Sequence, residues 1–170
     1  YPASKELCAV GGMVGNNAGG EKTLAYGKTE DYINSLKIIL SDGHEYLIKP
    51  LNRTELERKL VQPDFEGELY RQLFKLVTDN EIKLKEAKPK VSKNSAGYYL
   101  WNVWDGKTFN FCKLIVGSQG TLGIVTEITF RLVPVKSISK LLVIFLKDLT
   151  PLARLVNEIS PLKPVSIESY

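Results

Sequence analysis

The sequence predicts an α+β fold in which an antiparallel sheet is flanked by helices. Three patterns support this prediction: apolar and polar residues alternate over 124–132, two apolar runs within 35–48 flank a tight-turn dipeptide, and leucines recur at helical spacing over 64–77. Strands that alternate in this way bury one face of a sheet, and amphipathic helices supply the cover. We therefore expect a small sheet with helices packed on its apolar face.

The strands are predicted from a turn signal and from alternation. Residues 35–40 and 44–48 flank Asp42-Gly43, a dipeptide that suits a hairpin turn with positive φ. A long half-buried strand is expected downstream and ends at Pro134, because proline cannot donate to a sheet ladder. In this strand Ile124, Thr126, Ile128, Phe130 and Leu132 alternate with Glu127, Thr129 and Arg131.

The helices are predicted from capping signals and from leucine spacing. Residues 54–57, Thr-Glu-Leu-Glu, match a capping box and should open a short helix. A longer helix is expected over 64–77, with Asn80 ending it and opening another turn or two that Pro89 terminates. Residues 94–104 gather both tryptophans and two tyrosines, a density more typical of a core than of a stacking platform.

The last part of the chain has a different pattern. Residues 138–146 are expected to form a strand, Thr150-Pro151 to open a helix, and residues 165–167 to begin another strand. This pattern predicts a β-α-β unit. We accordingly divide the chain at 135/136, with residues 136–170 beginning a second domain.

Composition narrows the class of protein. With 170 residues, of which 44% are hydrophobic and 25% charged, the chain is long enough for a core. No apolar run approaches the roughly 20 residues that span a bilayer, and no signal peptide is recognisable, so we expect a cytoplasmic location and no transmembrane segment. Cys8 and Cys112 are expected to be buried thiols, and neither a disulfide nor a metal site is expected there. Because Met13 is the only methionine, we expect a piece of a longer or processed protein.

The charge pattern does not favour nucleic acid. The net charge is +4, and its main concentration is a run of lysines at positions 83, 85, 88, 90 and 93. Acidic residues are interleaved there, and Glu81 and Lys85 have the i,i+4 spacing of a solvated helix face. No nucleic-acid motif accompanies these charges, so no nucleic-acid partner is expected.

Two glycine clusters are the strongest candidates for a ligand site. Residues 117–126 place glycines at 117, 120 and 123 directly before the predicted strand, and residues 11–20 combine five glycines with two asparagines. Glycine lets a ligand approach the main chain, and the first cluster suits successive N–H groups turned toward one anion. The alternative is that these glycines only make tight turns.

The common phosphate motifs and catalytic constellations do not fit. A P-loop fails because Glu21 stands where lysine must follow Gly20, and no G-x-G-x-x-G dinucleotide fingerprint occurs in either cluster. The only histidine, His44, is expected to be a solvent-exposed strand residue. Neither a metal site nor a serine elbow is predicted. The residues favour a chain that holds a ligand, and no catalytic residue is assigned.

The ordered set of motifs resembles a known family. Residues 12–20, 26–31, 42–43 and 117–127, with the segment 94–98, are similar to the second half of the FAD-binding domain of the vanillyl-alcohol oxidase (PCMH) type. Within it the chain most resembles the D-lactate dehydrogenase and glycolate oxidase FAD-subunit group. The resemblance covers roughly residues 8–134 and implies that 1–135 is the second FAD-binding subdomain, with the region after Val135 beginning a substrate-capping domain.

The resemblance implies a partial FAD site, because the first subdomain of this family supplies another loop to the diphosphate. We therefore expect the isolated piece to bind FAD weakly and to be inactive. The residues implied to line the cofactor are Gly12, Gly15, Asn17, Ala18, Gly19, Gly20, Tyr26, Gly27, Gly120, Thr121, Gly123, Ile124 and Val125.

The implied reaction is oxidation of a small 2-hydroxy acid, of the D-lactate or glycolate type, by hydride transfer to FAD, with electrons passing on to a further acceptor. The catalytic base is expected to lie outside this chain. Two alternatives stay open: a non-catalytic binding module that uses residues 83–93 on the same scaffold, and another flavin oxidoreductase of this fold, such as a reductase of cell-wall precursor synthesis.

Overall fold

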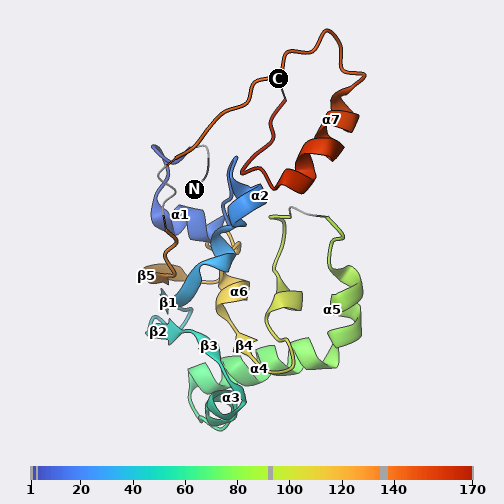
Figure 1. The fold of residues 1–170 in the computed structure, drawn as a ribbon. Helices are drawn as coiled ribbons and strands as arrows, with labels where there is room; N and C mark the ends of the chain where they lie inside the picture. The colour runs from blue at the N-terminus through green and yellow to red at the C-terminus, as the bar shows by residue number, and fades with distance from the viewer. Residues whose placement is uncertain (1, 3, 92–93, 135–137, 170) are drawn as a thin grey trace.

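The computed structural model describes residues 2, 4–91, 94–134 and 138–169. Its helices and strands follow one another along the chain, and Figure 1 shows their arrangement. The elements are α1 (Val10–Gly15), α2 (Thr23–Tyr26), η1 (Thr29–Asp31), β1 (Ile33–Ile39), β2 (Glu45–Ile48), β3 (Pro50–Leu51), α3 (Arg53–Leu60), α4 (Phe65–Asp79), α5 (Glu81–Ala87), η2 (Leu100–Asn102), β4 (Phe109–Asn110), α6 (Cys112–Ile115), β5 (Ile124–Phe130), α7 (Leu152–Ile159) and η3 (Ser160–Leu162).

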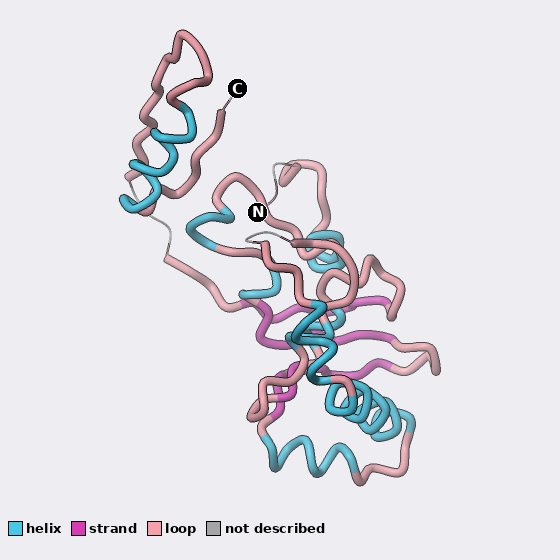
Figure 2. Tube along the Cα trace, turned by 90° about the vertical axis from the view of Figure 1, so that its right-hand side faces the viewer, coloured by secondary structure: helices cyan, strands magenta, loops and turns pink. Residues whose placement is uncertain are grey.

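An antiparallel sheet with the strand order β2-β1-β5 forms the centre of the fold. β1 and β2 make the predicted hairpin, and Gly43 in its turn has a φ of +80°. A separate two-stranded ladder joins β3 to β4. Figures 1 and 2 show α3 and α4 at one end of this body and α1 and α2 at the other. The predicted fold class, an antiparallel sheet flanked by helices, is confirmed.

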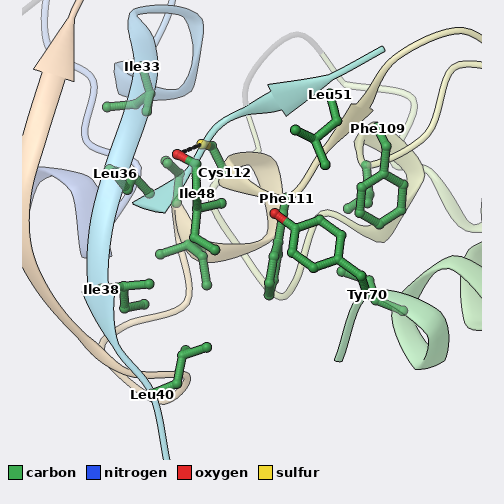
Figure 3. Close-up of a cluster of buried hydrophobic side chains, with 14 of the residues drawn as sticks. Ile33, Leu36, Ile38, Leu40, Ile48, Leu51, Tyr70, Phe109, Phe111 and Cys112 are labelled. Carbon is green, nitrogen blue, oxygen red and sulfur yellow. Dashed lines mark hydrogen bonds between the residues drawn. The ribbon is translucent and has the colours of Figure 1, made fainter. Parts of the chain in front are cut away.

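The core lies where the sheet meets α4 and the residues before α6. Leu36, Ile38 and Ile48 are each at most 1% exposed, and Tyr70 of α4 packs against Phe109 and Phe111 (Figure 3). The aromatic stretch at 94–104 follows the prediction of a core only in part: Tyr99 is buried, Trp101 and Trp104 are partly buried, and Tyr98 is 45% exposed. These contacts anchor α4 to the sheet from which the site is built.

Cys112 is a buried thiol in this core. Its Sγ–H donates to the carbonyl of Ile48 at 3.4 Å, and burial raises the pKa of the thiol to about 12 (Figure 3). A thiol that stays protonated is inert as a nucleophile. The expectation of a buried thiol is confirmed for Cys112, whereas Cys8 is also a free thiol but is only partly buried.

The predicted capping box is two residues too late. The N-cap of α3 is Asn52, whose Oδ1 accepts from the Glu55 N–H at 3.0 Å, while Glu55 Oε2 accepts from the Asn52 N–H at 3.0 Å. β3 ends at Leu51, so Asn52 is the first residue that is free to leave the ladder and cap the helix. The next helix follows the prediction more closely, with Asp64 as the N-cap of α4 and Asn80 as its C-cap.

The predicted alternation in β5 is interrupted by a bulge. Lys37 pairs with Glu127 and Ile38 with Val125, so that Thr126 is the extra residue. Val125 therefore packs against the core together with Ile128 and Phe130, whereas Ile124 is 68% exposed. At the start of the strand, the residues that face the core are therefore not the ones that were predicted. Leu132 lies beyond the end of β5, and 86% of its surface is exposed.

Only the helix of the predicted β-α-β unit forms. α7 begins after Pro151 as expected, but residues 138–146 and 165–167 make no strand in the described chain. Leu141 and Phe145 are 89% and 93% exposed, because this segment finds no ladder partner to satisfy its backbone groups and cover its side chains. Figure 2 shows this part standing apart from the sheet. The proposed division at 135/136 falls among residues that the structure does not describe.

The stability of the sheet should depend on its buried strand residues. Replacing Leu36, which is 1% exposed, by alanine is expected to lower the free energy of unfolding by about 2–5 kcal/mol, through lost apolar burial and the cavity left behind. The matched control is Leu47→Ala on the neighbouring strand, where the leucine is 54% exposed and the change should be about 0.5 kcal/mol. Urea unfolding of both variants measures the difference, and similar losses would contradict the packing described.

Candidate cofactor site

The two glycine clusters, far apart in sequence, lie directly against each other. The Gly117 N–H donates to the carbonyl of Val14 at 3.0 Å, and the Gln119 N–H donates to the carbonyl of Gly15 at 2.8 Å. The side chains add a contact, from Gln119 Nε2 to Asn16 Oδ1 at 3.2 Å. The two loops therefore form one continuous surface.

The first cluster is more regular than its composition suggests. Residues 10–15 form α1, and Asn17 follows it in the left-handed region with a φ of +47°. The N–H groups of Asn16, Asn17 and Ala18 turn back onto carbonyls of α1. The expected nest of successive N–H groups around one anion is therefore wrong for these positions, because the helix supplies their acceptors.

Some hydrogen-bond donors of the two loops are left over. Within the described part of the chain, the N–H groups of Gly19 and Gly120 have no acceptor, and the Nδ2 of the fully buried Asn17 has no partner. Buried polar groups are nearly always paired, so the Asn17 amide points to a missing acceptor. Unused donors on glycine-bearing loops fit an anionic group such as a diphosphate.

The space above the loops also fits a bound group. A Cβ built on Gly11, Gly12 or Gly120 would meet no protein atom within 4 Å, and one on Gly15 would lie 3.8 Å from the Gly120 nitrogen. Other glycines are required by internal packing instead. A Cβ on Gly19 would lie 2.6 Å from Thr23 Oγ1, and one on Gly123 would lie 2.6 Å from the carbonyl oxygen of Ile39.

The second loop is held by its own hydroxyls and by the aromatic segment. Thr121 Oγ1 donates to the Ser118 carbonyl at 2.6 Å, and it lies 2.7 Å from the hydroxyl of Tyr98. Ser118 is 4% exposed. The segment 94–98, which the sequence grouped with the glycine motifs, is thus connected to the second loop.

The other residues assigned to the cofactor lie around this surface. Tyr26 ends α2, and its carbonyl accepts a hydrogen bond from the Tyr32 hydroxyl. Gly27 follows with a φ of +74°, and Gly20 is tied through its N–H to Thr23 Oγ1 at 2.8 Å. Ile124 and Val125 pair with β1 at the start of β5. Their contact with a cofactor stays a prediction.

A buried charge cluster behind the loops was not predicted from the sequence. The carboxylate of Glu30, 8% exposed, lies 2.9 Å from Lys28 Nζ and 3.6 Å from Lys113 Nζ. Asn102 Nδ2 donates to it at 3.4 Å, and the Glu30 N–H donates to Asn17 Oδ1 at 3.0 Å. The sequence signal was present only as Glu30 inside the motif 26–31, since its partners come from distant segments.

The ionisation of this cluster is set by opposing effects. Burial alone would raise the pKa of Glu30, but Lys28 and Lys113 outweigh it and hold the pKa below its usual value. For Lys28, burial lowers the pKa, but Glu30 and Tyr99 raise it by more. The pKa of the Lys28 ammonium therefore lies above its usual value. Glu30 and Lys28 are therefore both charged at neutral pH.

Catalytic and metal candidates are few in this part of the fold. His44 is exposed, as expected, but it lies in the hairpin turn one residue before β2 and is not a strand residue; its Nδ1 lies 3.1 Å from Asp42 Oδ2. No group of His, Cys, Asp and Glu side chains among the described residues could hold a metal ion.

No helix found in the described chain is long and apolar enough to cross a membrane.

The lysine run does not form an uninterrupted basic patch. Lys85 lies 2.5 Å from Glu81 on α5, as the i,i+4 spacing predicted, and Lys93 lies outside the described residues. Pairs of this kind belong to a solvated helix face.

Comparison with known proteins shows what the first part of this surface is similar to. Residues 1–47, which include the first glycine cluster, β1 and most of β2, match a family described as an FAD binding domain. The resemblance inferred from the glycine motifs is thereby confirmed, and the cofactor of this domain is FAD.

The relatives extend the similarity beyond those residues. The chain is 28% identical to a D-2-hydroxyglutarate dehydrogenase of Pseudomonas putida over 98% of its length, and 28% identical to the glycolate oxidase subunit GlcD of Bacillus subtilis over 98%. It is 30% identical to a D-lactate dehydrogenase of Anaerostipes hadrus over 84% of its length. The chain spans only 17%, 25% and 20% of these three proteins, respectively.

The charge cluster should stabilise the folded chain at neutral pH and lose this contribution at acidic pH. Because the folded-state pKa of Glu30 is lowered, its contribution is fully present above the ordinary value of 4.5 and is lost as the pH falls through the folded pKa. Glu30→Gln should therefore be less stable than the original chain at neutral pH, with the difference shrinking below pH 4.5. Urea unfolding at a series of pH values measures this difference, and a gap that is independent of pH would contradict the ion-pair assignment.

Proposed function

We propose that this chain is part of an FAD-dependent oxidoreductase that oxidises a small 2-hydroxy acid to the 2-oxo acid. The observation that carries the proposal is the meeting of two glycine loops, with unused donors and open glycine faces, in a chain whose residues 1–47 match an FAD binding domain. Relatives named for D-2-hydroxyglutarate, D-lactate and glycolate support the class of substrate.

The chain's own residues would hold and orient the cofactor. The N–H groups of Gly19 and Gly120 and the amide of Asn17 are the donors available to a diphosphate, and Gly12 leaves room for close approach. The other proposed contacts are Gly15, Ala18, Gly20, Tyr26, Gly27, Thr121, Gly123, Ile124 and Val125. FAD, when bound, supplies the acceptor for the hydride removed from the hydroxy acid.

Four further features belong to this proposal. The base that takes the hydroxyl proton is assigned to a part of the protein outside this chain, and so is the contact with an electron acceptor. Residues 136–170 would begin the substrate-capping domain. A cytoplasmic location is proposed from the two free thiols, Cys8 and Cys112, which suit a reducing compartment.

The hydroxy-acid assignment predicts reduction of a bound flavin. The complete natural protein should purify with FAD, or take it up, and should lose the absorption of oxidised flavin when D-lactate, glycolate or D-2-hydroxyglutarate is added without oxygen. L-lactate serves as the stereochemical control for D-lactate. A protein that carries no flavin and acquires none would overturn the proposal, whereas a flavin reduced by none of these acids would leave only the substrate class wrong.

The open side of α1 gives a second prediction that separates cofactor contact from folding. Gly12→Ala adds a methyl group where no protein atom lies within 4 Å, so it should not destabilise the fold and could stabilise α1 by up to about 1 kcal/mol. It should nevertheless weaken FAD binding in the complete protein, because the methyl group would occupy the cofactor side. Flavin titration of the apoprotein measures the affinity.

The matched control is Gly11→Ala, the neighbouring glycine of the same helix, which is equally open but is not among the proposed contacts. Its FAD affinity should stay close to that of the original protein. Equal affinities for all three proteins would remove Gly12 from the site.

A further inference from the structure

The Glu30 carboxylate connects all three segments that make up the candidate site. It binds Lys28, which lies between the first loop and β1, at 2.9 Å. It faces Lys113 of α6, directly before the second loop, at 3.6 Å, and accepts from Asn102 of η2 at 3.4 Å. The three partners come from three separate regions of the chain.

The connections continue from these partners to the loops themselves. The Glu30 N–H holds Asn17 Oδ1 at 3.0 Å, and Asn17 in turn packs against Gly117, whose added Cβ would lie 3.4 Å from the Asn17 Cβ. Lys113 Nζ also donates to the Glu30 carbonyl at 2.9 Å. Lys28 Nζ donates to the Asn94 carbonyl at 2.5 Å and to the Tyr99 hydroxyl at 3.3 Å.

The geometry leaves one side of Asn17 for a ligand. Its Oδ1 is occupied by Glu30, which fixes the amide orientation, so that Nδ2 is the group without a partner in the described chain. Asn17 is 0% exposed and has a left-handed φ, a conformation that asparagine adopts readily directly after the C-cap of a helix. Its buried side chain is held by Glu30 and lies against the second loop.

The charges of the cluster balance one another. The carboxylates of Glu30 and of the exposed Asp31, whose Oδ1 lies 4.0 Å from Lys113 Nζ, face the ammonium groups of Lys28 and Lys113. The cluster therefore acts on the loops by ordering them, and it adds no net charge beside them.

We propose that Glu30 is a positioning residue for FAD, holding the Asn17 amide and the two glycine loops in one arrangement through Lys28, Lys113 and Asn102. This inference rests on the proposed function, since it concerns the same cofactor surface. Glu30 is not proposed to contact the cofactor itself. It acts through Asn17 and through the lysine that precedes the second loop.

The test is Glu30→Gln in the complete protein, with FAD affinity measured by flavin titration of the apoprotein. The neutral amide keeps the shape but loses the attraction to both lysines, and FAD should bind about tenfold more weakly. Lys113→Met is the second variant, because it removes the tie to the second loop while the Lys28 pair remains. It should also weaken FAD binding, and the double variant should lose less than the product of the two single effects.

The matched control is Glu66→Gln. Glu66 is equally buried, 8% exposed, and lies 2.5 Å from Lys59, but both residues belong to the α3–α4 end of the fold. This variant should lose stability and keep its FAD affinity.

The outcomes distinguish failure of the role proposed for Glu30 from failure of the proposed function. If the original protein binds FAD and both Glu30→Gln and Lys113→Met bind it as tightly, Glu30 has only a structural role and the inference is overturned. The same holds if Glu66→Gln weakens FAD as much as Glu30→Gln does. If the original protein binds no FAD, the proposed function fails first, and the inference fails with it.

Discussion

The backbone hydrogen bonds between the two glycine loops are the constraint on which the candidate site depends. Val14 and Gly15 supply the carbonyls, and Gly117 and Gln119 supply the N–H groups. These bonds are possible because β1 and β5, which follow the first and second loops, pair antiparallel in one sheet. A sheet pairing between distant strands thus brings together two loops that have no local reason to meet.

The bulge at Thr126 also affects how the second loop is placed. It lets Val125 face the core two residues after Gly123, whose lack of a side chain allows the backbone to pass the Ile39 carbonyl. A regular strand would instead turn the exposed Ile124 inward. The sheet therefore sets both the direction in which the second loop enters β5 and the packing beneath that loop.

Burial of charge gives the site its second constraint. A carboxylate that is 8% exposed is costly unless it is paired, and Glu30 finds two lysines and an amide from three separate segments. The pairing specifies one arrangement of those segments, because any other would leave a buried charge uncompensated. This specificity is distinct from the apolar core around Tyr70 and Phe109, which fixes α4 to the sheet at the other end of the fold.

The sequence by itself determined the local elements and the class of domain. The Asp42-Gly43 turn, the leucine spacing of α4 and the ordered glycine motifs each depend on neighbouring residues, so they could be recognised without coordinates. Only the tertiary structure decided which donors are left for a ligand, where the bulge falls, that residues 138–146 lack a strand partner, and that Glu30 joins three segments. The physical reason is that hydrogen bonds and ion pairs between distant segments depend on which strands pair, and residue spacing along the chain does not encode that choice.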